Sequence, residues 1–91
     1  MSIVVHLPSA LRAECDGQSL LMLNAATVRE TLARLESQYP KVYRSVCDET
    51  GSVRMHIHLY ANAYLIRSDE DLDRAMAAGD ELFIMTAVSG G

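Results

Sequence analysis

The segment between Thr27 and Pro40 constrains the fold most, because it carries the one long helical pattern in the chain. Thr27 and Glu30 have the spacing of a capping box, in which each side chain accepts a hydrogen bond from a backbone N–H group where a helix starts. Three apolar residues then recur at helical spacing: Val28, Leu32 and Leu35. The proline at position 40 ends the pattern. The segment therefore predicts an amphipathic helix with one apolar stripe to bury.

Short apolar or alternating runs lie on both sides of this helix and predict β-strands. They cover residues 3–7, 18–23, 55–60, 64–67 and 81–86. Asp16-Gly17 is a turn signal that would join the first two strands as a hairpin, and Asn62-Ala63 predicts a second tight turn. Residues 41–54 have the composition of a long connection with one short helical turn around Val42 to Val46, and residues 69–78 predict a brief helix.

One main helix with about four or five strands predicts an α+β fold, in which the helix packs on one face of a single mixed sheet. Because side chains alternate along a strand, one set should face the helix: Ile3, Val5, Leu7, Met55, Ile57, Leu59, Leu82 and Ile84. The other set should point outward: Val4, His6, His56, His58, Tyr60, Phe83 and Met85. The outward face of the sheet is therefore predicted to be exposed.

Composition excludes several classes of partner. The net charge is -4 and the eight basic residues are scattered singly, whereas nucleic acids and anionic membranes require a concentrated basic surface. No apolar run approaches the roughly 18 residues of a membrane span, and the first residues lack the pattern of a secretory signal. We therefore expect a cytoplasmic protein that binds no nucleic acid and no membrane.

The cysteines and the histidines could serve as metal ligands or reactive groups, but their spacing does not match a known type of site. Cys15 and Cys47 lie far apart without metal-type spacing, so we expect free thiols in a reducing compartment. His56 and His58 would share a face of one strand and could chelate a metal with His6. A zinc site needs further ligands and supporting hydrogen bonds, so we favour histidines that contact a partner, and we expect no bound metal.

The chain ends in a pair of glycines, which offer no side chain for packing. The C-terminal segment reads Gly79-Asp80-Glu81-Leu82, then Ile84, then Ala87-Val88-Ser89-Gly90-Gly91. With the order of the predicted elements, it resembles the C-terminal signature of the bacterial ThiS and MoaD sulfur carriers, which have the ubiquitin-like β-grasp fold. That family commonly has Pro where this chain has Thr86, and Gly where it has Ala63. The extra length near residues 40–54 resembles the subgroup that supplies sulfur for cysteine or sulfur-containing natural products.

The resemblance implies a protein co-substrate rather than an enzyme. Residues 1–86 would form the β-grasp domain and residues 87–91 a flexible tail, with Ala87, Val88 and Ser89 docking in a partner's channel. Gly90 and Gly91 have no Cβ atom, so they could enter a narrow channel. The family's chemistry converts the C-terminal carboxylate, here that of Gly91, into an acyl-adenylate and then into a thiocarboxylate that donates sulfide.

The resemblance also implies the partners. An adenylating, E1-like enzyme would use ATP and Mg²⁺ in its own site, so this chain would bind no cofactor. A sulfur-acceptor enzyme, such as a cysteine-synthase-like protein, would receive the sulfide, and a metalloprotease could trim the C-terminus. Because the first and last strands of a β-grasp sheet are neighbours, we expect one partner-binding patch of Val4, His6, His58, Phe83 and Met85. Phe83, as an exposed aromatic, would be its anchor.

Three other interpretations stay open. Within the same resemblance, the chain could be the small subunit of molybdopterin synthase, or a modifier conjugated to lysines as ubiquitin is. It could also be a β-grasp interaction module with an inert tail. The long segment at residues 40–54 and the absence of Pro at position 86 favour the carrier over the molybdopterin subunit.

We expect the tail to be mobile in the free protein, because nothing after Val88 can pack and terminal residues fray unless they are tied down. Backbone ¹⁵N relaxation should give order parameters below about 0.6 for residues 89–91, against about 0.85 in the last strand. Equal order parameters in the tail and the strand would contradict this expectation and favour a docked tail.

Overall fold

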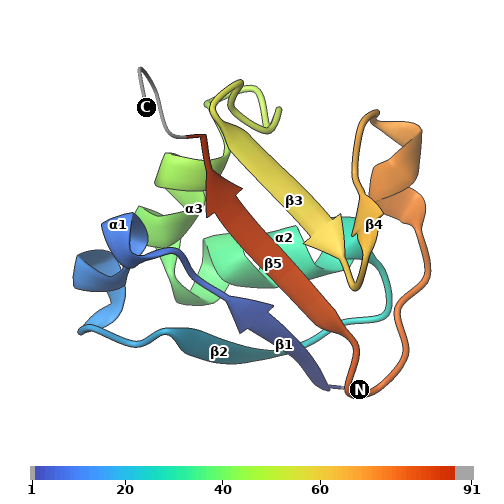
Figure 1. Cartoon of the computed structure of the whole chain (residues 1–91), viewed down its shortest axis with the longest axis horizontal. Coiled ribbons are helices and arrows are strands. Elements are labelled where there is room, and N and C mark those ends of the chain that lie inside the picture. The colour runs from blue at the N-terminus through green and yellow to red at the C-terminus, as the bar shows by residue number, and fades with distance from the viewer. Residues whose placement is uncertain (1, 88–91) are drawn as a thin grey trace.

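The computed structural model describes residues 2–87, which form a five-stranded sheet with helices on one face (Figure 1). The strands are β1 Ser2–His6, β2 Leu20–Asn24, β3 Ile57–Ala61, β4 Tyr64–Leu65 and β5 Glu81–Thr86. Their order in the sheet is β2-β1-β5-β3-β4. The central pair β1 and β5 is parallel, and the other neighbouring pairs are antiparallel. The predicted α+β class with a mixed β-grasp sheet is confirmed.

Helix α2 (Val28–Gln38) is the predicted main helix, and its capping box is present. The backbone N–H of Glu30 donates to Oγ1 of Thr27 at 3.0 Å. The Glu30 carboxylate accepts from the backbone N–H of Ala26 at 2.9 Å, one residue before the cap that the sequence pattern suggested. The cap orients the helix so that its apolar stripe packs on the sheet, burying Val28, Thr31, Leu32 and Leu35.

The predicted alternation of the strands holds for most of the core. Seven residues expected to face the helix are at most 5% exposed: Ile3, Val5, Leu7, Ile57, Leu59, Leu82 and Ile84. Burying a Val, Leu or Ile side chain stabilises a fold by about 1.5–3 kcal/mol, so this shared interior holds the sheet against the helices.

The predicted first hairpin is wrong in its connection, although β1 and β2 do pair antiparallel. A short helix α1 (Ser9–Arg12) and a 3-10 turn η1 (Ala13–Cys15) lie between the two strands. Leu11 and Cys15 are buried in them, so apolar contacts with the core stabilise this excursion over a tight turn. Asp16-Gly17, both with positive φ, reverse the chain after η1 instead of joining the strands directly.

The connection after α2 contains more helix than the single turn expected. Helix α3 (Pro40–Val46) starts directly after the C-cap residue Tyr39, with Pro40 in its first turn. Proline is favoured there, since its missing N–H would have no helical partner. Val42 and Val46 are fully buried and attach α3 to the core.

Met55 and His56 were predicted to lie in a strand, with Met55 facing the helix, and both placements are wrong. The N–H of Ile57 donates to the carbonyl of Arg54 at 3.0 Å, so residues 54–57 form a turn and β3 starts only at Ile57. Met55 therefore points away from the core and is 98% exposed.

The last segments also differ in detail from the expectation. The strand predicted at residues 64–67 is reduced to β4, and the helix predicted at residues 69–78 is reduced to the 3-10 turn η2 (Glu70–Asp73). Asp73 and Asp69 are held by Arg29 of α2, which ties η2 to the main helix. Within residues 2–87, no helix is long and apolar enough to cross a membrane.

Replacing Thr27 by alanine should destabilise the fold, because the Glu30 N–H would lose its acceptor at the start of α2. Loss of an N-cap hydroxyl costs about 1 kcal/mol of unfolding free energy. The thermal midpoint should therefore fall by about 4–8 °C, measured by circular dichroism. Thr27→Ser retains the hydroxyl and serves as the control. A midpoint unchanged in Thr27→Ala would show that the Glu30–Ala26 contact suffices to cap the helix.

Candidate functional site

The path of β5 determines where the C-terminal tail leaves the domain. Thr86, the last residue of β5, lies opposite Ile57, the first residue of β3. One position further, the N–H of Ala87 donates to the carbonyl of His56 at 2.7 Å. The predicted tail residues Val88, Ser89, Gly90 and Gly91 lie outside the described residues. The tail therefore begins at a defined point beside the start of β3.

The Gly79-Asp80-Glu81 motif sets the start of the same strand. Gly79 has φ of 85°, a conformation that side chains with a Cβ atom rarely adopt. The Asp80 carboxylate accepts from the N–H of Ala77 at 2.7 Å, and its carbonyl accepts from the N–H of Val4 at 3.0 Å. The motif thus fixes the register of β5 against β1.

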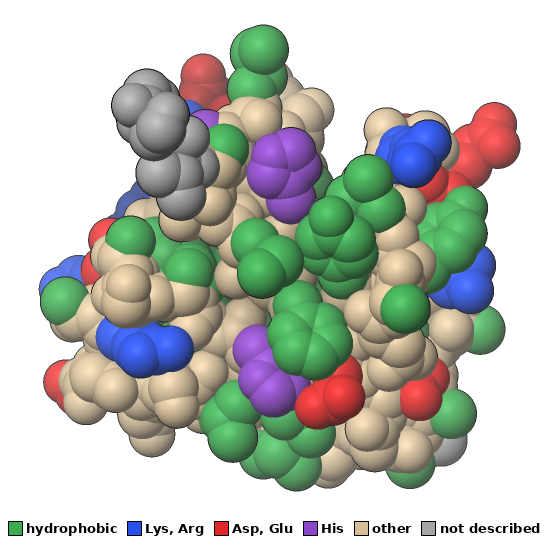
Figure 2. Space-filling model, viewed as in Figure 1, with side chains coloured by type: hydrophobic (Ala, Val, Ile, Leu, Met, Phe, Trp, Pro, Cys, Tyr) green, Lys and Arg blue, Asp and Glu red, His purple; other side chains and the backbone are tan. Residues whose placement is uncertain are grey.

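The face of the sheet that the helices leave uncovered carries a continuous set of apolar and histidine side chains (Figure 2). We call it the outer face, and its side chains are Val4, His6, Leu20, Met22, His58, Tyr60, Phe83 and Met85. The pairs His6–Leu20, His6–Phe83, Tyr60–Phe83 and His58–Met85 are register neighbours, so they share this face. Large exposed apolar surfaces of this kind mark binding sites.

Phe83 lies at the centre of the outer face but is half-buried, not fully exposed as expected. Its ring stacks on the imidazole of His6, with ring centroids 4.3 Å apart and an angle of 13° between the planes. Nε2 of His6 lies 2.8 Å from a carboxylate oxygen of Glu81, which holds the imidazole in place. Phe83 is therefore covered by neighbours on its own face rather than by a loop.

The structure brings together four of the five residues predicted for the partner-binding patch in register pairs: His6 with Phe83, and His58 with Met85. Val4 shares the face beside them, opposite Met22. His56 is separate, because it lies in the turn before β3. Leu20, Met22 and Tyr60 also belong to the face. The alternation of the strand predicted at residues 18–23 would have identified Leu20 and Met22 as members of this face.

The histidines and cysteines lack the arrangement of a reactive centre. Among residues 2–87, no three His, Cys, Asp or Glu side chains are grouped so that they could hold a metal ion. Cys15 and Cys47 are free and buried, and burial raises the pKa of both thiols above the ordinary value. Activated thiols have a lowered pKa instead, so neither cysteine has the properties of a nucleophile.

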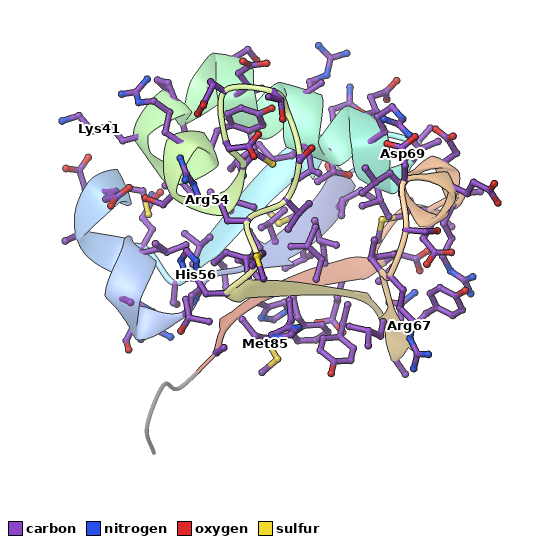
Figure 3. The ribbon with its side chains drawn as sticks, turned by 90° about the horizontal axis from the view of Figure 1, so that it is seen from above. Lys41, Arg54, His56, Arg67, Asp69 and Met85 are labelled. Carbon is purple, nitrogen blue, oxygen red and sulfur yellow. The ribbon has the colours of Figure 1, made fainter. Side chains whose placement is uncertain are left out.

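A groove of about 740 Å³ lies between α2, β3 and the loops around Arg54 and Arg67 (Figure 3). Its floor is apolar and includes Leu32 and Ile57. Arg29 on its rim already forms ion pairs with Asp69 and Asp73. The hydrogen bond from the Arg29 side chain to the Asp73 carboxylate lowers the pKa of Asp73. Met55 and Ile57 also line the groove, and they flank His56, whose carbonyl accepts from Ala87 where the tail leaves the domain.

A β-grasp domain with an uncovered apolar face beside its C-terminal exit defines the class of this protein. The sequence profile of the ThiS family matches residues 6–91. The chain therefore belongs to the ThiS family of sulfur carriers. Its fold agrees, with a five-stranded mixed sheet and the helices on one face.

Three relatives make the likeness specific. The sulfur carrier protein CysO of Mycobacterium tuberculosis is 28% identical over 93 residues, covering 100% of both chains. A crystal structure of that CysO has a TM-score of 0.83 and covers 94% of this chain and 99% of that chain. A chain of the BexX/CysO complex from Amycolatopsis orientalis is 28% identical, with a TM-score of 0.85 over 98% of this chain and 99% of that chain. The small archaeal modifier protein SAMP1 from Haloferax volcanii is 29% identical, with a TM-score of 0.82 and 100% coverage of both chains.

Proposed function

We propose that this protein is a sulfur carrier whose Gly91 carboxylate is activated by a partner enzyme and converted into a thiocarboxylate. The family match carries the proposal, because it extends over residues 6–91 and so includes both the domain and the terminal Gly90-Gly91. The full-length likeness to a sulfur carrier protein, CysO, supports it.

The chemistry explains why the chain supplies a tail and the partner supplies the catalytic groups. A carboxylate is a poor electrophile, so one of its oxygens first attacks the α-phosphorus of ATP and pyrophosphate leaves. Sulfide then attacks the acyl carbon, AMP leaves, and the resulting thiocarboxylate carries the sulfur to its acceptor. ATP and Mg²⁺ belong to the partner's site, so the carrier itself needs no cofactor. It acts as a co-substrate, not as an enzyme.

The outer face is the proposed docking surface for the adenylating enzyme. Phe83 lies at its centre, and Met85 is 50% exposed two residues before the tail begins. The four residues after Ala87 can span about 13 Å when extended. A partner that covers the outer face could therefore receive Gly91 in a short channel that opens on the partner's own docking surface.

Further partners follow from the same chemistry. The thiocarboxylate needs an acceptor, for which we propose an enzyme of the cysteine-synthase type, and a metalloprotease could expose Gly91 by trimming a longer C-terminus. The BexX/CysO complex supports the proposal that a carrier of this kind binds a second protein. Two buried free thiols fit a reducing compartment, and we propose the cytoplasm.

A modifier is the second candidate function, because SAMP1 is as similar as CysO and covers the whole chain. Both functions need the same activated C-terminus and differ in the nucleophile that attacks it, sulfide or an amine. The likeness to a molybdopterin converting factor subunit from Pyrococcus furiosus is 14% in sequence and supports the shared fold alone.

Sulfur transfer to Gly91 should raise the intact mass of the protein by about 16 Da, because one carboxylate oxygen is replaced by sulfur. The measurement is mass spectrometry after incubation with an adenylating enzyme, ATP, Mg²⁺ and sulfide. Deleting Gly91, or adding residues after it, should abolish the shift and leave the circular dichroism spectrum unchanged. Thiolation of the Gly91-deleted chain at the parent's level would refute the carrier proposal.

Phe83→Asp should weaken activation by about 2 kcal/mol or more, roughly 30-fold in kcat/KM, because it places a charge at the centre of the outer face. Loss of the stacked ring costs stability of about 0.5–1.5 kcal/mol, so the variant should remain folded. Met55→Asp is the matched control, since Met55 is exposed and apolar but lies outside the outer face.

Met85→Asp provides a second variant at a more exposed position of the same face. Normal activation of both folded variants would remove the outer face from the docking surface. Unfolding of Phe83→Asp together with normal activation of Met85→Asp would assign Phe83 to the core instead.

A further inference from the structure

Lysine is nearly absent from this chain. Of its eight basic residues, seven are arginines and one, Lys41, is a lysine. The guanidinium of arginine stays protonated in proteins, so it is not a nucleophile. Apart from the α-amino group at the N-terminus, Lys41 is the one amine in the chain that could attack an activated carboxyl group.

Lys41 is presented on a well-anchored element. It follows Pro40 in the first turn of α3, which Val42 and Val46 attach to the core. The side chain is exposed, and its ammonium makes no hydrogen bond or ion pair with any residue from 2 to 87. The one hydrogen bond to Lys41 from a side chain, from Oγ of Ser45, goes to its backbone carbonyl at 3.3 Å. The amine is therefore available to a reagent from outside.

Lys41 and the outer face lie on opposite sides of the molecule. Figure 3 shows Lys41 on the side of the helices and Met85 on the side of the sheet. A partner docked on the outer face would hold the tail of the donor in its own site, away from Lys41 of the same molecule. It would also leave Lys41 of another copy uncovered.

We infer that Lys41 is the acceptor for an isopeptide bond with the activated Gly91 of a second copy of this chain. The inference rests on the proposed adenylation of Gly91. The neutral ε-amine attacks the acyl carbon, the bond from that carbon to the phosphate oxygen breaks, AMP leaves with the electron pair, and the proton of the amine passes to solvent. Sulfide and Lys41 compete for the same carbon, so the linkage forms when sulfide is scarce.

The test uses the full chain with an adenylating enzyme that thiolates it, ATP and Mg²⁺, with and without sulfide. Without sulfide we expect a covalent dimer with a mass about 18 Da below twice that of the monomer, since amide formation removes one water. Peptide mapping should find the C-terminal peptide of one copy joined to Lys41 of the other.

Two variants separate the amine from the charge of α3. Lys41→Arg keeps the charge and removes the nucleophile, so the yield of dimer should fall at least about tenfold while thiolation with sulfide is unchanged. Arg44→Gln alters the charge of the same helix and keeps Lys41, so the yield should stay within about twofold.

The outcomes distinguish this inference from the proposed function. Linkage to the α-amino group, a parent chain that is thiolated but never dimerises, or an equal loss of dimer in Arg44→Gln would each overturn the role of Lys41. A parent chain that gains no sulfur from any adenylating enzyme would overturn the proposed function instead.

Discussion

The parallel pairing of β1 with β5 is the constraint on which the rest of the structure depends, because it joins the first and last strands at the centre of the sheet. Val5 and Leu82 lie opposite each other in this pair, and both are fully buried. Parallel neighbours cannot be joined by a tight turn, so the intervening chain must cross over one face of the sheet. Helices α2 and α3 lie in that crossover and bury one face, which leaves the outer face uncovered.

The same pairing positions the tail. Gly79 and Asp80 fix the register in which β5 starts, and β3 then holds β5 along its length until Ala87. Glu81 connects the motif to the outer face through His6, whose ring stacks on Phe83. One motif of three residues thus sets the start of the last strand, the orientation of the central aromatic and, through the length of β5, the exit of the tail.

Local signals predicted the fold well where they coincided with burial. Three such signals depend only on residues close together in the sequence. They are the hydrogen bond of the capping box at Thr27, the alternating burial along β5 and the positive φ of Gly79. The prediction failed at α1 and at Met55. Leu11 and Cys15 lie in helical turns in which both pack into the core, and the turn at residues 54–57 rotates Met55 outward. Neither effect is encoded within a short stretch of sequence.

The candidate site was predictable to the same degree. Alternation placed His6, His58, Phe83 and Met85 on one face, and the register pairs His6–Phe83 and His58–Met85 agree with that placement. The stacking of His6 on Phe83 and the contact of His6 with Glu81 join residues about 75 positions apart, and only the parallel register of β1 and β5 brings them together.

Thr86 shows how the chain can depart from the family pattern without altering the pairing of β5 with β3. In an antiparallel pair, hydrogen-bonded and non-hydrogen-bonded positions alternate. The N–H groups of Asn62 and Ala87 donate to the carbonyls of Glu81 and His56, so the position of Ala87 is a hydrogen-bonded one. Thr86 precedes it and lies opposite Ile57 at a non-hydrogen-bonded position, so its N–H does not point toward β3. The proline common in the family would therefore break no bond to β3 at this place. The substitution acts on the freedom of the backbone just before the tail, since proline restricts φ and threonine does not.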